Sequence, residues 1–177
     1  MKVTVFGSAQ PRPGDPAYEE AICLGRLLAE EGHTVLTGGY MGTMEAVSRG
    51  AVEAGGHAIG VTCREIESWR KTGANPWVRE EWHTQTLTER IDRMIEGCDA
   101  AFALNGGPGT LTEVSLMWNR MTIHATRQRL LVLIGPRWQQ AFSGMFSALD
   151  SFIALQDRSL LSFAADVKSA VRMLPQP

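Results

Sequence analysis

Short apolar runs alternate with longer amphipathic stretches along most of this chain. The runs are rich in Val, Leu, Ile and Ala and end near glycine or other turn-forming residues, which is typical of buried β-strands. They cover residues 3–7, 34–37, 58–61, 100–104 and 130–134, and a shorter run covers 160–163.

The amphipathic stretches carry apolar residues at helical spacing. They predict helices at residues 16–31, 43–54, 86–97, 110–122, 139–150 and 164–174. Strands and helices that alternate in this way form βαβ crossovers and a parallel sheet. We therefore predict a single doubly wound, Rossmann-like α/β domain over residues 1–177. Helices should flank its mostly parallel central sheet, with ligands at the carboxyl ends of the strands.

Residues 62–84 interrupt the alternation. The segment is polar but contains Trp69, Trp77 and Trp82, and a loop of this length in a compact domain is often functional. The tryptophans could stack on a nucleobase, cover a partner subunit, or pin the loop to its own domain. For any single tryptophan we favour the last interpretation.

Composition and charge narrow the function classes. The 177 residues are 44% apolar and 20% charged, with a net charge of −2, so they indicate neither nucleic acid nor a membrane as a partner. The three cysteines form no C-x-x-C pair, and the four histidines show no metal-ligand spacing. We therefore expect no disulfide framework and no metal site, in a protein that works in the reducing cytoplasm without a cofactor.

A glycine-rich loop at residues 105–113 is the stretch around which the chain is organised. It reads Asn-Gly-Gly-Pro-Gly-Thr-Leu-Thr-Glu and joins an apolar run to a helical pattern. Free N–H groups at a helix N-terminus favour phosphate, so Gly106, Gly107, Gly109 and Thr110 could cradle it, with Glu113 facing the bound group. Alternatively, Thr110 caps the helix and Glu113 completes a T-x-x-E capping box.

A stretch at residues 37–45 has a similar shape. It contains Gly38, Gly39, Gly42 and Thr43, and in both stretches a glutamate follows the Gly-Gly pair after the same interval. Two such loops predict one nucleotide-sized anion held from two sides. Glu45 is either a second carboxylate of that site or a helix-surface residue.

The loop after the first strand lacks the G-x-G-x-x-G fingerprint of NAD-type Rossmann domains, which counts against a dehydrogenase. Ser8 could still offer its hydroxyl and backbone to a ligand at the carboxyl end of the strand. An ordinary turn serine is an equally good interpretation.

Two arginines of the predicted helix at 86–97 have different local partners. Arg93 has Glu89 four residues before it and Glu96 three after, so a helix-surface ion pair explains it. Arg90 has no acidic residue at either spacing. We expect Arg90 to be free for an anion from outside the helix.

These motifs together resemble the Lonely Guy family. The resemblance rests on Gly-Gly-x-x-Gly-Thr at 38–43, on Arg90 followed by Asp99-Ala100 and a strand, and on Gly-Gly-x-Gly-Thr-x-x-Glu at 106–113. It implies a Rossmann-like homodimer that hydrolyses the N-glycosidic bond of cytokinin riboside 5′-monophosphates or AMP to a free base and ribose 5-phosphate. The apolar residues Met117, Trp118 and Met121 give the homodimer weak further support.

Matched residue by residue, the resemblance makes Arg90 and Glu113 the catalytic pair and the loop at 106–110 the phosphate site. Asn105 stands where the family motif has proline, Ile91 where it usually has lysine, and Glu45 where the plant enzymes commonly have glycine. These departures keep a second hypothesis open, in which the same pocket only binds a nucleotide or carries a molybdenum cofactor.

The family's older label, possible lysine decarboxylase, does not fit the lysines of this chain. A pyridoxal-phosphate decarboxylase needs a lysine for its Schiff base. The chain has only Lys2, Lys71 and Lys168, and none lies at a glycine loop. We therefore reject that activity.

Overall fold

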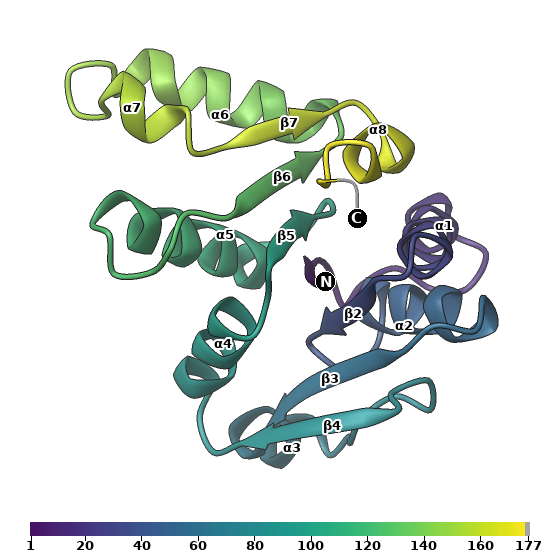
Figure 1. Cartoon of the computed structure of the whole chain (residues 1–177). Helices are drawn as coiled ribbons and strands as arrows, with labels where there is room; N and C mark the ends of the chain where they lie inside the picture. Colours follow the sequence, from purple (N-terminus) through teal and green to yellow (C-terminus); the bar gives the residue numbers. More distant parts are fainter. Residues whose placement is uncertain (176–177) are drawn as a thin grey trace.

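The computed structural model describes residues 1–175, and in this range seven parallel strands form one sheet (Figure 1). The strands lie in the order β4-β3-β2-β1-β5-β6-β7. They are β1 (Lys2–Phe6), β2 (Thr34–Thr37), β3 (Ala58–Cys63), β4 (Glu80–Thr84), β5 (Ala100–Ala103), β6 (Leu130–Ile134) and β7 (Ser162–Ala164). The predicted doubly wound α/β fold is confirmed, although positions 176–177 of the predicted domain lie outside the described residues.

Helices cover both faces of the sheet. They are α1 (Pro16–Glu30), α2 (Thr43–Glu53), α3 (Arg64–Arg70), α4 (Leu87–Glu96), α5 (Pro108–Thr122), α6 (Pro136–Ala148), α7 (Leu155–Arg158) and α8 (Val167–Val171). One hydrophobic core lies between the sheet and α1, α2 and α8, and a second lies between the sheet and α4, α5 and α6. Figure 1 shows α1 and α2 to the right of the sheet and α4 and α5 to its left. Because side chains alternate along each strand, Val3 and Val5 enter the first core and Phe6 the second.

Strand β4 corrects the prediction that residues 62–84 form one long loop. β3 continues to Cys63, α3 follows directly, and β4 pairs with β3 at the edge of the sheet. An edge strand keeps much of its surface in water, so its sequence carries little apolar periodicity. In Glu-Glu-Trp-His-Thr, the residues of β4, only Trp82 is apolar.

Several helix limits also differ from the prediction. α5 begins at Pro108 and α6 at Pro136, because proline suits the first turn of a helix. The predicted helix at 164–174 is shortened, since Ala164 ends β7 and α8 covers only Val167–Val171. The short helix α7 was not predicted.

Of the three α5 residues that gave weak support to a homodimer, Met117 and Met121 lie in the core of their own chain and Trp118 is partly buried against it. Met117 and Met121 are fully buried. The Trp118 ring packs edge-on against Phe142 and Phe146, with centroid separations of 5.9 and 6.0 Å. Met117 and Met121 are therefore not available to a partner subunit, and the homodimer stays a prediction.

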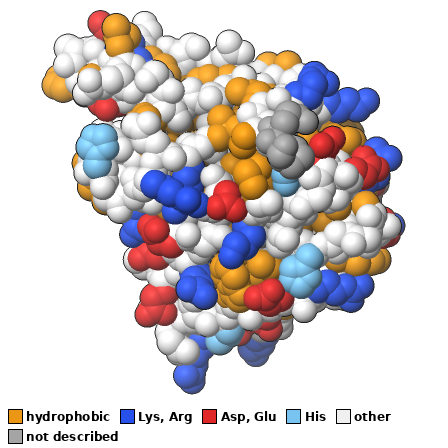
Figure 2. Space-filling model, viewed as in Figure 1, with side chains coloured by type: hydrophobic (Ala, Val, Ile, Leu, Met, Phe, Trp, Pro, Cys, Tyr) orange, Lys and Arg blue, Asp and Glu red, His pale blue; other side chains and the backbone are white. Residues whose placement is uncertain are grey.

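The surface carries mixed charge. On the face shown in Figure 2, basic and acidic side chains are interspersed rather than gathered by sign, in keeping with the net charge of −2. Among residues 1–175, no helix has the length and apolar character needed to cross a bilayer.

The direction of chain progression reverses at β1. From β1 the chain proceeds to β2 on one side, whereas β5 pairs with the other side of β1. In open α/β sheets, ligands bind in the crevice at this switch point, beyond the carboxyl ends of the strands. Both glycine-rich loops and the loop after β1 end at this crevice, so the topology brings the predicted site residues to one end of the sheet.

Candidate functional site

A cavity of about 440 Å³ opens at the switch point, within the usual size range of small-molecule sites. Its walls are the loop after β1, the start of α2 with Tyr40 before it, α3, α4 and the N-terminal half of α5. Of the predicted site residues, the lining includes Ser8, Arg90, Gly107, Gly109, Thr110 and Glu113. These six come from three separate parts of the sequence.

Arg90 is buried, which corrects the expectation that its side chain is free. Only 5% of it is exposed, and its guanidinium donates from Nε to the Val61 carbonyl at 2.7 Å and from Nη2 to the Gly38 carbonyl at 3.0 Å. The guanidinium carbon also lies 5.5 Å from the centroid of the Tyr40 ring, within cation–π range. These contacts with other elements hold the positive charge in the cavity wall in one orientation.

Gly38 makes this arrangement possible. A Cβ atom at that position would lie 1.7 Å from Nη2 of Arg90, so any side chain would displace the guanidinium. Gly38 was predicted to bind the anion directly; in the structure its carbonyl and its missing side chain instead position Arg90.

Glu113 faces Arg90 from the second turn of α5. Its Oε1 lies 3.5 Å from Nη1 of Arg90, and 9% of the glutamate side chain is exposed. Burial raises the pKa of Glu113 from 4.5 to about 7, against the opposing effect of the Arg90 charge. A cavity carboxyl whose pKa lies near neutrality is typical of functional sites.

The capping-box alternative for Glu113 is excluded. Gly107 is the N-cap of α5 and makes no side-chain cap, and the Glu113 side chain points to Arg90 instead. The capping box of this region belongs to α4, where Thr86 and Glu89 cap each other reciprocally.

The N-terminus of α5 is open toward the cavity. A Cβ atom on Gly107 or Gly109 would meet no heavy atom within 4 Å, whereas Thr110 is buried, with its hydroxyl packed against Gly106. The first N–H groups of a helix lack intrahelical acceptors. Around Gly109 and Thr110 these groups are therefore positioned to bind an anion with the helix dipole behind them.

The first glycine loop is not open in the same way. Thr43 at the start of α2 donates both its N–H, at 2.8 Å, and its hydroxyl, at 3.1 Å, to the Ser8 carbonyl. Gly42 has a positive φ of 73°, and a Cβ atom there would lie 2.3 Å from the same carbonyl oxygen. Gly39 packs tightly on Gly60 and Thr62. Gly39, Gly42 and Thr43 thus pack behind the cavity wall and are not part of the cavity lining.

Ser8 contacts the first glycine loop and lines the cavities beside the second. Its carbonyl is occupied by Thr43, and its hydroxyl accepts a hydrogen bond from the Gln10 N–H at 3.1 Å. It lines the main cavity and also a neighbouring one of about 420 Å³. That neighbouring cavity includes Asn105, Gly106 and Arg137, so the space beside the second glycine loop extends well beyond Glu113.

Tyr40 was missed by the sequence analysis. Its hydroxyl accepts from the Cys63 N–H at 2.7 Å and lies 3.3 Å from Oε1 of Glu67. Burial raises the pKa of Tyr40 to about 12, so the phenol stays neutral. The available signal was an aromatic residue directly inside a glycine motif at the end of a strand.

The tryptophans and Arg93 have mostly local partners. The Arg93 guanidinium lies over the Trp82 ring, with its carbon 4.6 Å from the ring centroid. This contact replaces the predicted ion pair of Arg93, since Glu89 is used in the α4 cap. Trp77 is half-buried, with the Arg49 guanidinium 5.7 Å from its ring. Trp69 differs, because it is 76% exposed at the rim of the main cavity.

Comparison with known proteins identifies the family of this chain. Residues 1–140 match the model of the SLOG cluster4 family. The probable cytokinin riboside 5′-monophosphate phosphoribohydrolase LOGL9 of Oryza sativa subsp. japonica is 34% identical, over 99% of this chain and 78% of its own length. The corresponding enzyme LOG7 of Arabidopsis thaliana is 31% identical, over 91% and 75%.

A solved structure extends the comparison to a protein with another role. The molybdenum cofactor carrier protein of Chlamydomonas reinhardtii is 27% identical, with a TM-score of 0.70 over 97% of this chain and 93% of its own. The family model and the two plant relatives, taken with the glycine loops and the Arg90–Glu113 pair, establish that this chain belongs to the LOG family within SLOG cluster4.

Proposed function

We propose that this chain hydrolyses the N-glycosidic bond of a nucleoside 5′-monophosphate, a cytokinin riboside monophosphate or an AMP-like nucleotide. The observation that carries the proposal is the buried Arg90–Glu113 pair beside the open N-terminus of α5. The names of the plant relatives give the reaction class.

The 5′-phosphate binds at the N-terminus of α5 in this proposal. The N–H groups around Gly109 and Thr110 and the helix dipole provide complementary partial charge. A phosphate held there anchors the nucleotide away from the reacting bond, so its binding energy helps to orient the ribose.

Glu113 acts on the ribose. Cleavage passes through an oxocarbenium-like state with positive charge at C1′ and the ring oxygen, and a carboxylate in a poorly hydrated wall stabilises that charge. The C1′–N bond breaks with its electron pair on the base, the oxygen of water bonds to C1′, and one water proton ends on the base.

Arg90 positions Glu113 and opposes the effect of burial on its ionisation. Its Nε and Nη2 atoms are fixed by backbone carbonyls, which leaves Nη1 directed at the carboxylate. The arrangement keeps a fraction of Glu113 ionised near neutral pH although the group is buried.

The test is incubation of the purified protein with a panel of nucleoside 5′-monophosphates, followed by chromatographic detection of free base and ribose 5-phosphate. The matched nucleosides without phosphate serve as controls and should be cleaved far more slowly, because they lack the anchor. If no monophosphate of the panel releases free base, the hydrolase proposal fails.

A carrier or binding role is the second candidate. It is favoured by the likeness to the molybdenum cofactor carrier over nearly the whole chain and by Asn105, which replaces the proline expected before the second Gly-Gly pair. Under this alternative, nucleotides or a molybdenum cofactor bind at equilibrium and are recovered intact.

We also propose a homodimer, on the strength of the family resemblance alone. Sedimentation at micromolar concentration tests it, and a monomer under those conditions would contradict it.

A further inference from the structure

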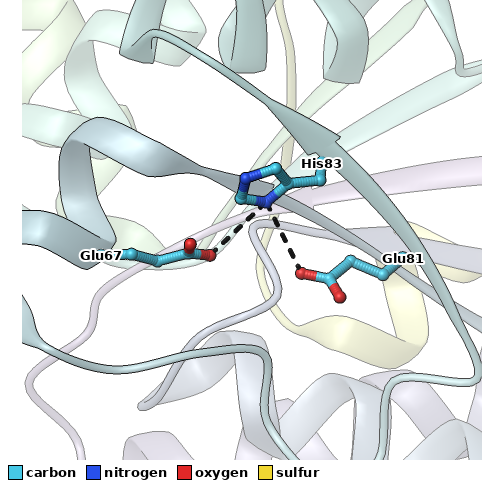
Figure 3. A group of neighbouring side chains, drawn as sticks. All are labelled: Glu67, Glu81 and His83. Atoms are coloured by element: carbon cyan, nitrogen blue, oxygen red, sulfur yellow. Dashed lines mark ion pairs between the residues drawn. The ribbon is translucent and has the colours of Figure 1, made fainter.

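Three side chains of metal-binding type converge outside the cavity. Glu81 and His83 are two residues apart on β4 and so point to the same side of the sheet, where Glu67 of α3 meets them (Figure 3). The Nδ1 atom of His83 lies 3.6 Å from Oε1 of Glu67 and 3.9 Å from Oε1 of Glu81. All three ligand atoms lie within 4.8 Å of one another.

Hydrogen bonds from the interior orient these ligands. The Thr62 hydroxyl lies 2.5 Å from Oε1 of Glu81 and 3.0 Å from Nδ1 of His83. The Tyr40 hydroxyl lies 3.3 Å from Oε1 of Glu67. Thr62 and Tyr40 are both buried. These contacts with buried hydroxyls restrict the direction of the three side chains, as outer partners do in metal sites. At Nδ1 of His83 the ion would replace the Thr62 hydroxyl, because a ligating nitrogen needs a free lone pair.

We propose that Glu67, Glu81 and His83 bind a divalent transition-metal ion of the Zn²⁺ type. One imidazole and two carboxylates suit zinc, whereas Mg²⁺ and Ca²⁺ prefer oxygen ligands alone. Ligands of tetrahedral zinc lie about 3.3 Å apart. The two separations from Nδ1 of His83, 3.6 and 3.9 Å, must close slightly, and the two carboxylates must also approach each other from a separation of up to 4.8 Å. Both Glu81 and His83 have 43% of their side chains exposed, which allows that movement and gives the ion a route from solvent.

The ion would hold one wall of the cavity in place. Glu67 lies on α3, and its neighbours Ile66 and Trp69 line the cavity. Tyr40 bonds to Glu67 through its hydroxyl, while its ring faces Arg90. A metal that joins α3 to β4 would therefore stabilise the α3 wall of the cavity without using Glu113 as a ligand. This role does not depend on whether the chain is a hydrolase or a carrier.

The first test is calorimetric titration of the full, chelator-treated chain with ZnCl₂. We expect one high-affinity site in the wild type and at least tenfold weaker binding in His83→Ala and in Glu67→Gln. His57→Ala is the matched control. The Nε2 atom of His57 lies 3.1 Å from Oε2 of Glu80, which is on the same strand as Glu81 and His83. His57 is about as exposed as His83 but has only one carboxylate beside it. It should bind Zn²⁺ like the wild type.

The second test uses hydrogen exchange and Co²⁺. Adding Zn²⁺ should slow amide exchange in residues 64–70 of the wild type and leave exchange in His83→Ala unchanged. Co²⁺ should give the visible absorption of a four-coordinate site in the wild type and in His57→Ala only. The proposal is overturned if the wild type binds Zn²⁺ no more tightly than His83→Ala, or if His57→Ala removes binding equally. Unchanged exchange in α3 on saturation would overturn its role in the cavity wall.

Discussion

Replacing Glu113 by glutamine separates the charge of this side chain from its shape. Glutamine has nearly the same volume and can still accept a hydrogen bond from Nη1 of Arg90, now 3.5 Å from Oε1 of the glutamate. What it removes is the negative charge beside the developing oxocarbenium ion. We expect turnover of a nucleoside monophosphate to fall at least ~100-fold, equivalent to about 2.7 kcal/mol of transition-state stabilisation.

The same substitution has a calculable effect on stability. Burial raises the pKa of Glu113 from 4.5 to about 7, so the folded state holds a proton that the unfolded state releases between these pH values. The contribution of this group to the free energy of unfolding is therefore fully present below pH 4.5 and is lost as the pH rises through 7. At about 1.4 kcal/mol for each tenfold change in ionisation, the loss reaches about 3 kcal/mol at pH 8. Glu113→Gln does not titrate, and should gain about that much relative to wild type between pH 4.5 and pH 8.

Urea denaturation across this pH range measures the stability difference, and initial rates over the same range measure turnover. Wild-type activity should rise with pH up to a plateau above about pH 7, because the ionised carboxylate is the active form. Glu45→Gln is the control, since Glu45 has the same spacing in the first loop but does not line the cavity. Full turnover in Glu113→Gln, or wild-type activity that falls as the pH rises through 7, would refute the assigned role.

Four further substitutions test the surroundings of the pair. Arg90→Ala should abolish turnover and cost about 3–5 kcal/mol in urea denaturation, because it leaves a buried carboxylate and two carbonyls without their donor. Gly38→Ala should reduce turnover as severely, because the added Cβ displaces Nη2 of Arg90. In Gly109→Ala the added Cβ meets no heavy atom within 4 Å, so this variant should fold normally and mainly weaken phosphate binding, which calorimetry measures. Tyr40→Phe should cost about 1–3 kcal/mol in thermal denaturation, because the Cys63 N–H loses its acceptor. Equal stability of Arg90→Ala and wild type, or full turnover in Gly38→Ala, would contradict the contacts described.

The central strands could be predicted because their whole surface is buried. β2 and β6 are continuous apolar or β-branched runs with sharp ends, and their observed limits match the predicted ones. β4 could not be found in this way, because one of its edges lacks a neighbouring strand and its side chains are mostly polar. The pattern of apolar residues along a sequence reflects which side chains are buried, and an edge strand buries few of its side chains.

The site was predictable where its chemistry is local. The spacing of Gly106 to Glu113 predicted a glycine loop followed by a carboxylate, and the structure places Gly107, Gly109 and Glu113 in the wall of one cavity. The surroundings of Arg90 were not predictable, because its acceptors at Val61 and Gly38 lie 29 and 52 residues away in the sequence. Reasoning along one helix covers partners three or four positions away, and on that basis Arg90 was wrongly described as free.

The two glycine loops show why similar motifs can have different roles. At α2, the Ser8 carbonyl already accepts the first N–H of the helix, and the backbone of Ser8 and Ala9 covers Gly42. At α5, one residue fewer separates the Gly-Gly pair from the Gly-Thr pair, and Gly109 faces open space. An anion can therefore reach the α5 dipole but not the α2 dipole. The first loop instead fixes the loop after β1 and presents the Gly38 carbonyl to Arg90. In the proposed function it therefore orients the Arg90–Glu113 pair, while the second loop would bind the anion.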